Sequence, residues 1–214
     1  MTARGSESVL RERIVEHGRS LHQRGFVPGS SGNISVRLDD GLLVTPTNSC
    51  LGRLDPADVS RLDSQGRHLS GAKPSKEAFL HLLMYQKRPE DRAVVHLHST
   101  DSVAVSCLAD IDPENVLPPI TAYYVMRIGR LPLVPYFRPG DMALAEAVAA
   151  LAERHHAVLL ANHGPVVAGQ DLDAAVYAIE ELEETARLYL RLQGQRVRCL
   201  TESQVEELER VFGS

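Results

Sequence analysis

The apolar residues of the chain recur with two periods, one typical of helices and the other of strands. Leu10, Ile14 and Leu21 share one face of a helix, and similar apolar stripes recur further along the chain. Glycines and polar capping residues lie at the ends of several stripes. The pattern predicts helices over residues 6–24, 76–87, 141–154 and 171–192, a short helix near 103–107, and a last helix after the capping-box residues 201–204.

The strands predicted from the sequence are short. Residues 34–38 alternate between apolar and polar, and an Asp40-Gly41 turn separates them from the apolar run 42–44, a pattern that predicts a β-hairpin. Further apolar runs predict strands over residues 93–97, 131–136 and 157–161. Because strands and helices alternate along the chain, we expect an α/β fold with a sheet covered by helices.

The composition is typical of a globular protein. Of the 214 residues, 43% are hydrophobic and 24% are charged, and no linker-like segment divides the chain, so we expect one domain over residues 1–214. A net charge of −5 without clustered Lys and Arg argues against a nucleic-acid partner. The lack of a long apolar segment and the three widely spaced cysteines predict a cytoplasmic protein without a membrane partner. The expected partner is a small molecule.

Three histidines form a candidate metal site. His96 and His98 are one residue apart on a predicted strand, so both rings project from the same face and can share one metal ion. On its own such a pair is better explained by two hydrogen-bonded histidines at a strand end. The apolar run 158–160, however, delivers His163 to the end of another predicted strand. Three histidines with one open position are typical of a catalytic zinc site.

Two other histidines and one glutamate complete the set of candidates. His155 and His156 lie at a predicted helix end, where positive charge favours the helix dipole, and we interpret them as structural or solvated. Glu77 falls in the first turn of the predicted helix 76–87, whose N-cap would be Ser75, and is the best candidate for a general acid or base. Taken alone, its position is better explained by the preference of glutamate for helix N-termini.

Small and hydroxyl-bearing residues suggest an anion site. Gly32-Asn33, Thr45-Pro46-Thr47 and Ser75 offer backbone N–H groups and hydroxyls that suit a phosphate. Each is weak evidence, because turns are generally rich in such residues. Arg127 and Arg138 are further candidates for bidentate binding of a carboxylate or phosphate, although exposed arginines are common.

Five motifs together resemble the class II aldolase/adducin family. They match in order and in rough spacing, and the resemblance covers nearly the whole chain. The motifs are Ser31-Gly32-Asn33-Ile34-Ser35, Val44-Thr45-Pro46-Thr47, Pro74-Ser75-x-Glu77, His96-Leu97-His98 and Asn162-His163-Gly164. The resemblance implies a three-layer sandwich in which helices flank a central, mostly antiparallel sheet.

The resemblance also implies roles for the candidate residues. Glu77 would be the acid or base that can also bind the metal, expected to be Zn²⁺ with other divalent metals as alternatives. The implied metal ligands are Glu77, His96, His98 and His163. The implied phosphate pocket contains Gly32, Asn33, Thr47, Ser75 and Lys76, although Lys76 stands where the sugar-phosphate aldolases tend to have a second serine.

Members of this family are typically homotetramers with active sites at subunit interfaces. The tyrosine that such aldolases lend across the interface would be Tyr123 or Tyr124, which spacing does not separate, and Tyr124 is taken as the candidate catalytic residue. A further departure from the family pattern is Asp101, because relatives commonly carry a histidine there.

Within the family, residues 98–100, 123–127 and 135–141 look most like the 3-oxo-tetronate 4-phosphate decarboxylases. This resemblance implies a metal-dependent lyase that converts a phosphorylated sugar acid to dihydroxyacetone phosphate and CO2 through an enediolate. An L-fuculose-phosphate-like aldolase forms the same enediolate and is the alternative. A pentulose-phosphate 4-epimerase and a non-catalytic, adducin-like interaction domain are the remaining alternatives.

Overall fold

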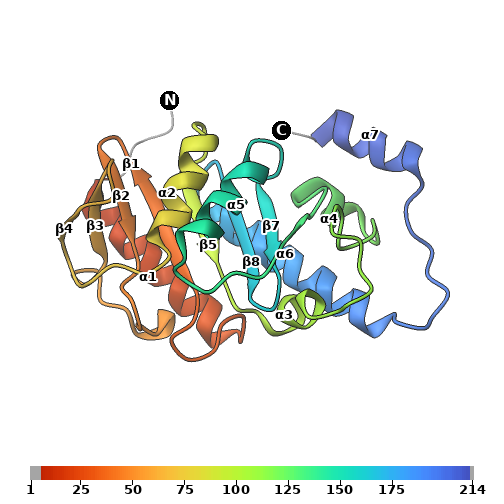
Figure 1. The fold of residues 1–214 in the computed structure, drawn as a ribbon, viewed down its shortest axis with the longest axis horizontal. Coiled ribbons are helices and arrows are strands. Elements are labelled where there is room, and N and C mark those ends of the chain that lie inside the picture. Colours follow the sequence, from red (N-terminus) through yellow and green to blue (C-terminus); the bar gives the residue numbers. More distant parts are fainter. Residues whose placement is uncertain (1–5, 213–214) are drawn as a thin grey trace.

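The computed structural model describes residues 6–212, which form one eight-stranded sheet between two layers of helices (Figure 1). The strand order is β4-β3-β2-β1-β5-β8-β7-β6, and in this described part neighbouring strands are antiparallel except for β6 and β7. The strands are β1 (Asn33–Leu38), β2 (Gly41–Val44), β3 (Ser60–Asp63), β4 (His68–Ser70), β5 (Ala93–His96), β6 (Leu133–Val134), β7 (Ala157–Leu160) and β8 (Gly164–Gly169).

The helices cover both faces of this sheet. Helices α2 and α5 pack on one face, and α1 and α6 pack on the other, with α3 and α4 beside α6 (Figure 1). The helices are α1 (Glu7–Gln23), the 3-10 turn η1 (Leu51–Arg53), α2 (Ala78–Lys87), α3 (Thr100–Ser106), α4 (Ala122–Arg127), α5 (Met142–Ala152), α6 (Leu172–Arg191) and α7 (Glu202–Phe212).

The alternation of side chains along β5 separates two apolar cores. Ala93 and Val95 join the core under α1 and α6, whereas Val94 joins the core under α2 and α5. Since side chains of a strand alternate between its faces, His96 lies on the α2 side with Val94. This arrangement confirms the predicted three-layer α/β sandwich with a mostly antiparallel sheet, and it fixes the face on which the candidate site lies.

The helix predicted over residues 76–87 begins two residues later than expected. The N-cap of α2 is Glu77 and not Ser75. The Ser75 hydroxyl instead accepts a hydrogen bond from the Glu77 N–H at 3.2 Å within the turn before the helix, and the Ala78 N–H bonds to the Ser75 carbonyl oxygen. A turn therefore precedes the helix, and Glu77 occupies the N-cap position itself. Glu77 therefore lies at the N-terminal end of α2 instead of inside its first turn.

The other predicted helices are confirmed, whereas several strands differ from expectation. Strand β6 covers two residues of the predicted run 131–136, because Pro132 and Pro135 lack the N–H groups that a ladder needs. The sequence pattern did not predict α4 or the strands β3, β4 and β8. Within the described residues no helix is long and apolar enough to cross a membrane, and the three cysteines are unpaired.

Candidate metal centre

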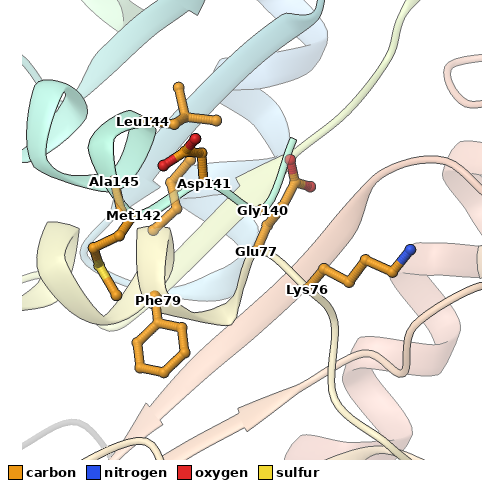
Figure 2. A pocket seen from close by; sticks show the side chains of 9 residues that line it. Lys76, Glu77, Phe79, Gly140, Asp141, Met142, Leu144 and Ala145 are labelled. Carbon is orange, nitrogen blue, oxygen red and sulfur yellow. The ribbon is translucent and has the colours of Figure 1, made fainter. Parts of the chain in front are cut away.

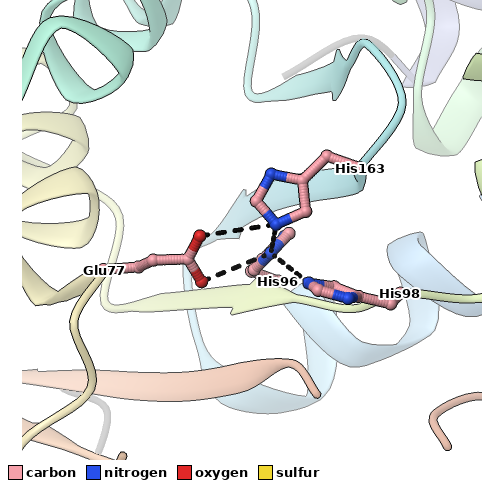
Figure 3. A group of neighbouring side chains, drawn as sticks. All are labelled: Glu77, His96, His98 and His163. Atoms are coloured by element: carbon pink, nitrogen blue, oxygen red, sulfur yellow. Dashed lines mark hydrogen bonds and ion pairs between the residues drawn. The ribbon is translucent and has the colours of Figure 1, made fainter. Parts of the chain in front are cut away.

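Four polar side chains meet beside the central strand β5. Glu77, His96, His98 and His163 each offer one ligand atom, and these atoms lie within 4.8 Å of one another. The Nε2 atom of His96 is 3.1 Å from Nε2 of His98 and 3.3 Å from Nε2 of His163. The Glu77 carboxylate faces the rings, with Oε2 3.5 Å from His96 Nε2 and Oε1 3.4 Å from His163 Nε2 (Figure 3). The structure therefore brings together the four residues predicted as metal ligands.

The pairing of β5 with β8 places these residues. His96 is the last residue of β5 and lies opposite Val166 of β8, so the turn before β8 brings His163 close. Gly164 permits this approach, because its φ is +153° and a Cβ there would lie 2.3 Å from the Leu97 carbonyl oxygen. Glycine avoids both the backbone strain and the clash, so the residue after His163 sets how closely the two strand ends meet.

Four distances in the cluster are close to those expected between ligands of one divalent metal, and the ligand atoms as a set lie within 4.8 Å of one another. Bonds of about 2.0–2.1 Å to nitrogen and oxygen place the ligand atoms of a tetrahedron roughly 3.4 Å apart. The four distances above run from 3.1 to 3.5 Å. Within the described residues, Glu77 Oε1 is buried without a hydrogen-bond partner, which suits an oxygen that binds a cation.

The protonation states of the cluster also suit a metal. His96 Nδ1 lies 2.8 Å from the Pro165 carbonyl oxygen, so the ring places its proton on Nδ1 and offers the Nε2 lone pair. Burial, together with the neighbouring His96, lowers the pKa of His98 to about 3 and that of His163 to about 4. Burial alone would raise the pKa of Glu77, but His96, His163 and a side-chain hydrogen bond outweigh it and lower that pKa. Neutral imidazoles and an ionised carboxylate are the states that metal ligands require.

The sequence of the chain is similar to proteins of a known family. The family model of the class II aldolase and adducin N-terminal domain matches residues 12–190. The chain belongs to this family. A 3-oxo-tetronate 4-phosphate decarboxylase of Haemophilus influenzae is 53% identical over 205 residues, which cover 95% of this chain and 98% of that protein. An L-fuculose phosphate aldolase of Methanocaldococcus jannaschii is 37% identical over 181 residues, which cover 84% of this chain and 95% of that protein.

A solved structure supports the same class II aldolase fold. The crystal structure of YgbL from Escherichia coli matches with a TM-score of 0.92 at 50% identity, and the match covers 94% of this chain and 98% of that chain. The resemblance found in the five sequence motifs is thereby confirmed at the level of the family and of the fold.

Residues predicted to bind phosphate lie around the cluster on neighbouring segments. A Cβ at Gly32 would lie 2.9 Å from the His96 carbonyl oxygen, so the turn before β1 runs directly against the end of β5. The Thr47 N–H donates to the Lys73 carbonyl oxygen at 2.9 Å, and Ser75 follows two residues later, next to the turn that leads to α2. The phosphate-binding role of these residues stays a prediction.

Asn33 and Lys76 differ from the rest of that set. Asn33 is buried, and its Nδ2 donates to Glu77 Oε2 at 2.8 Å, so this amide is engaged within the protein. Lys76 is exposed and borders a pocket of about 140 Å³ between the N-terminal ends of α2 and α5, but its side chain extends away from the pocket (Figure 2). The pocket is also lined by Glu77, Phe79, Asp141, Met142 and Leu144.

The two candidate interfacial tyrosines lie in different environments. Tyr124 is 1% exposed, its hydroxyl faces the Leu117 carbonyl oxygen at 3.5 Å, and burial raises its pKa. Tyr123, by contrast, is 61% exposed. A side chain lent to a neighbouring subunit must be reachable from outside, so burial argues against Tyr124 and favours Tyr123.

The remaining candidates lie outside the four-residue cluster; they are Asp101, Arg127, Arg138, His155 and His156. Asp101 forms an ion pair with Arg187 of α6, with Oδ2 2.9 Å from Nε. His156 Nδ1 lies 3.1 Å from a backbone carbonyl oxygen of β8, which agrees with its predicted structural role. The departure from the family pattern at Asp101 is thus accommodated by a helix-to-helix ion pair.

Three buried polar residues next to the cluster were not predicted from the sequence: Ser35, His81 and Tyr85. One signal was available for His81, because it follows Glu77 by four residues and therefore lies on the same side of the helix. His81 stands among the apolar residues of α2, and this position gives no indication of a polar role.

Proposed function

We propose that this chain is a metal-dependent carboxy-lyase that converts 3-oxo-tetronate 4-phosphate to dihydroxyacetone phosphate and CO2. The observation that carries the proposal is identity over most of the chain. It is 51–53% to five proteins named as 3-oxo-tetronate 4-phosphate decarboxylases, against 33–37% to three named as L-fuculose phosphate aldolases. The geometry of the cluster supports the chemistry that both reactions share.

The reaction breaks the bond between C1 and C2 of the substrate. The carboxylate leaves as CO2, its electron pair passes through C2 to the ketone oxygen on C3, and an enediolate results. Addition of one proton at C2 then gives dihydroxyacetone phosphate. A divalent metal bound at the cluster supplies positive charge that stabilises the developing oxyanion, an effect worth several kcal/mol.

Glu77 is suited to deliver that proton. Its Oε2 already accepts a hydrogen bond from Asn33 Nδ2 at 2.8 Å, whereas Oε1 is buried without a hydrogen-bond partner in the described residues. A proton held by this carboxyl group therefore resides on Oε1, the oxygen that also faces His163. Oε2 thus holds the side chain, whereas Oε1, which would bind the metal before the substrate does, would take up a proton from solvent and pass it to C2 once the substrate occupies the site.

We propose zinc as the metal, since three imidazoles and a carboxylate within 4.8 Å of one another are ligands that zinc favours. The phosphate of the substrate would bind at the turns that surround the cluster. Gly32, Thr47, Ser75 and Lys76 are the proposed contacts, together with the backbone N–H of Asn33.

We further propose a cytoplasmic homotetramer in which Tyr123 reaches the active site of a neighbouring subunit. The exposure of Tyr123 supports this role. Light scattering coupled to size-exclusion chromatography would give the mass of the assembly, and a monomer at assay concentrations with full activity would contradict the shared site.

A comparison of substrates on metal-analysed protein tests the proposed reaction. The expected result is release of CO2 and dihydroxyacetone phosphate from 3-oxo-tetronate 4-phosphate, with little cleavage of L-fuculose 1-phosphate. The reverse result would replace the decarboxylase with the aldolase, which uses the same cluster. Protein that retains no divalent metal and turns over neither substrate would instead favour the non-catalytic, adducin-like domain.

A further inference from the structure

A chain of buried polar side chains runs from Tyr85 to the catalytic carboxylate. The Tyr85 hydroxyl lies 2.8 Å from Ser35 Oγ, and Ser35 Oγ lies 2.7 Å from His81 Nδ1. On the other side of the ring, His81 Nε2 lies 2.5 Å from Asn33 Oδ1, and Asn33 Nδ2 lies 2.8 Å from Glu77 Oε2. The first four side chains of this relay are buried.

The carboxylate at one end dictates the direction of the hydrogen bonds between Ser35 and Glu77. Ionised Glu77 can only accept, so the Asn33 amide must turn its Nδ2 toward it and its Oδ1 toward His81. An amide oxygen also only accepts, so His81 must carry its proton on Nε2.

The same reasoning continues to the far end of the relay. The unprotonated Nδ1 of His81 must accept the hydroxyl proton of Ser35. Ser35 Oγ can then only accept from Tyr85, whose hydroxyl also lies 3.1 Å from the Ser35 carbonyl oxygen, so the single Tyr85 proton has two acceptors. From Ser35 to Glu77 the donors point toward the carboxylate, and reversal of any of these three hydrogen bonds would place two donors or two acceptors against each other.

His81 is suited to hold this pattern. Burial lowers its pKa to about 3, so the ring is neutral near pH 7 and can donate from one nitrogen while it accepts at the other. The far end of the relay is also fixed, because the Arg37 guanidinium stacks on the Tyr85 ring at 4.6 Å from its centroid.

We propose that His81 is a positioning residue: its Nε2–H sets the Asn33 amide so that Nδ2 holds Glu77 Oε2 and Oε1 is directed at the metal centre. The consequence for catalysis rests on the proposed role of Glu77. The hydrogen-bond pattern itself does not rest on that role, because it follows from the geometry of the buried side chains. Loss of His81 would let the amide rotate and would leave Glu77 free to turn away from the histidines.

Two substitutions of His81 separate positioning from simple packing. In His81→Gln the side-chain amide can reach Asn33 and donate as Nε2 does, whereas in His81→Asn the amide is too short and replaces only the Nδ1 side. We expect His81→Asn to lower kcat about 10–100-fold with little change in KM, and to weaken zinc binding by a similar factor in a competition assay without substrate. His81→Gln should retain most of the wild-type kcat and most of the wild-type zinc affinity.

A half-buried histidine outside the relay provides the control. His156 bonds to a backbone carbonyl oxygen of β8, so His156→Asn perturbs a half-buried ring without touching Asn33, and its kcat and zinc affinity should remain near those of the wild type. Equal losses of kcat and of zinc affinity in His81→Asn, His81→Gln and His156→Asn would show that His81 acts only through packing and would overturn the proposal.

The tautomer of His81 gives a test that needs neither a variant nor turnover. Nitrogen-15 NMR of the wild-type, metal-free protein should show a protonated Nε2 and an unprotonated Nδ1 for this ring near pH 7. A proton on Nδ1 would refute the deduced direction of the relay even in an active decarboxylase. Conversely, the expected tautomer and the expected loss of zinc affinity in His81→Asn would stand even if the substrate comparison failed.

Discussion

Removal of the metal is expected to lower the melting temperature of the protein, and His98→Ala should abolish most of that effect. In the metal-free state Glu77 Oε1 is buried without a hydrogen-bond partner in the described residues, and His96 Nε2 lies within hydrogen-bond distance of the Nε2 atoms of both His98 and His163. A metal that binds only the folded chain stabilises it by RT ln(1 + [L]/Kd), or about 2.7 kcal/mol at a hundredfold excess over Kd.

The size of the expected shift follows from the length of the chain. For a domain of this size, 1 kcal/mol corresponds to about 2–4 °C, so zinc at that excess should raise the melting temperature of chelator-treated protein by about 5–11 °C. Loss of the His98 ligand should weaken binding at least as much as the roughly 100-fold upper range for outer-shell partners. At the same zinc concentration, the stabilisation then falls below about 0.4 kcal/mol, or less than about 2 °C.

Differential scanning calorimetry of metal-free protein, titrated with zinc, measures both shifts. His68→Ala is the matched control, because His68 is exposed on β4 and does not belong to the cluster, and it should keep the full wild-type shift. A His98→Ala protein that zinc stabilises as strongly as the wild type would remove His98 from the ligands, and a wild type that zinc does not stabilise would refute the metal site.

Three further predictions concern the surroundings of the site. Unfolded histidines protonate near pH 6.5, whereas His81 stays neutral when folded down to its pKa of about 3. The stability of the metal-free protein should therefore fall as the pH drops from 6.5 toward 4, by up to about 1.4 kcal/mol per pH unit for this ring. Urea titrations at several pH values should show a weaker dependence of the free energy of unfolding on pH for His81→Gln than for the wild type. An unchanged dependence on pH would contradict the assignment of this effect to His81. Gly164→Ala should cost about 2–4 kcal/mol in urea unfolding, because its Cβ would lie 2.3 Å from the Leu97 carbonyl oxygen. Gly194→Ala, with a φ of +75° and nothing within 4 Å, should cost only about 1 kcal/mol, and equal costs would argue against the clash. Asp101→Ala should lose at most about 1 kcal/mol of stability, as a partly exposed ion pair implies, and should keep its kcat; a large loss of kcat would return Asp101 to the active site.

The four residues of the candidate metal centre could be picked out from the sequence because their arrangement is largely local. His96 and His98 are separated by one residue at a strand end, and the period of a strand is enough to place both rings on one face. His163 follows an apolar run that forms β7, as its residues indicate. Glu77 was identified as well, although its place at the N-cap depends on the turn made by Ser75, which a helical pattern does not reveal.

The features that the sequence did not predict depend on contacts between distant residues. His81 and Asn33 meet across 48 positions of the chain, and neither side chain carries a local signal of the other. Strand β8 was missed because it contains two glycines and a proline, which the pattern assigns to turns. Tyr123 and Tyr124 could not be separated because α4 was not predicted. Without a helix, there was no basis for placing adjacent residues on different faces.

The antiparallel pairing of β5 with β8 has a consequence for how the protein acquires its metal. His96 and His163 are 67 residues apart in sequence, so an ion that gathered both in the unfolded chain would have to close that loop, at an entropic cost of about 4 kcal/mol. The short His96-x-His98 segment can hold an ion loosely before folding, but the remaining ligands arrive only when the central strands have paired. We therefore expect the metal to bind late in folding. An ion that binds at that stage lowers the unfolding rate and leaves the folding rate nearly unchanged.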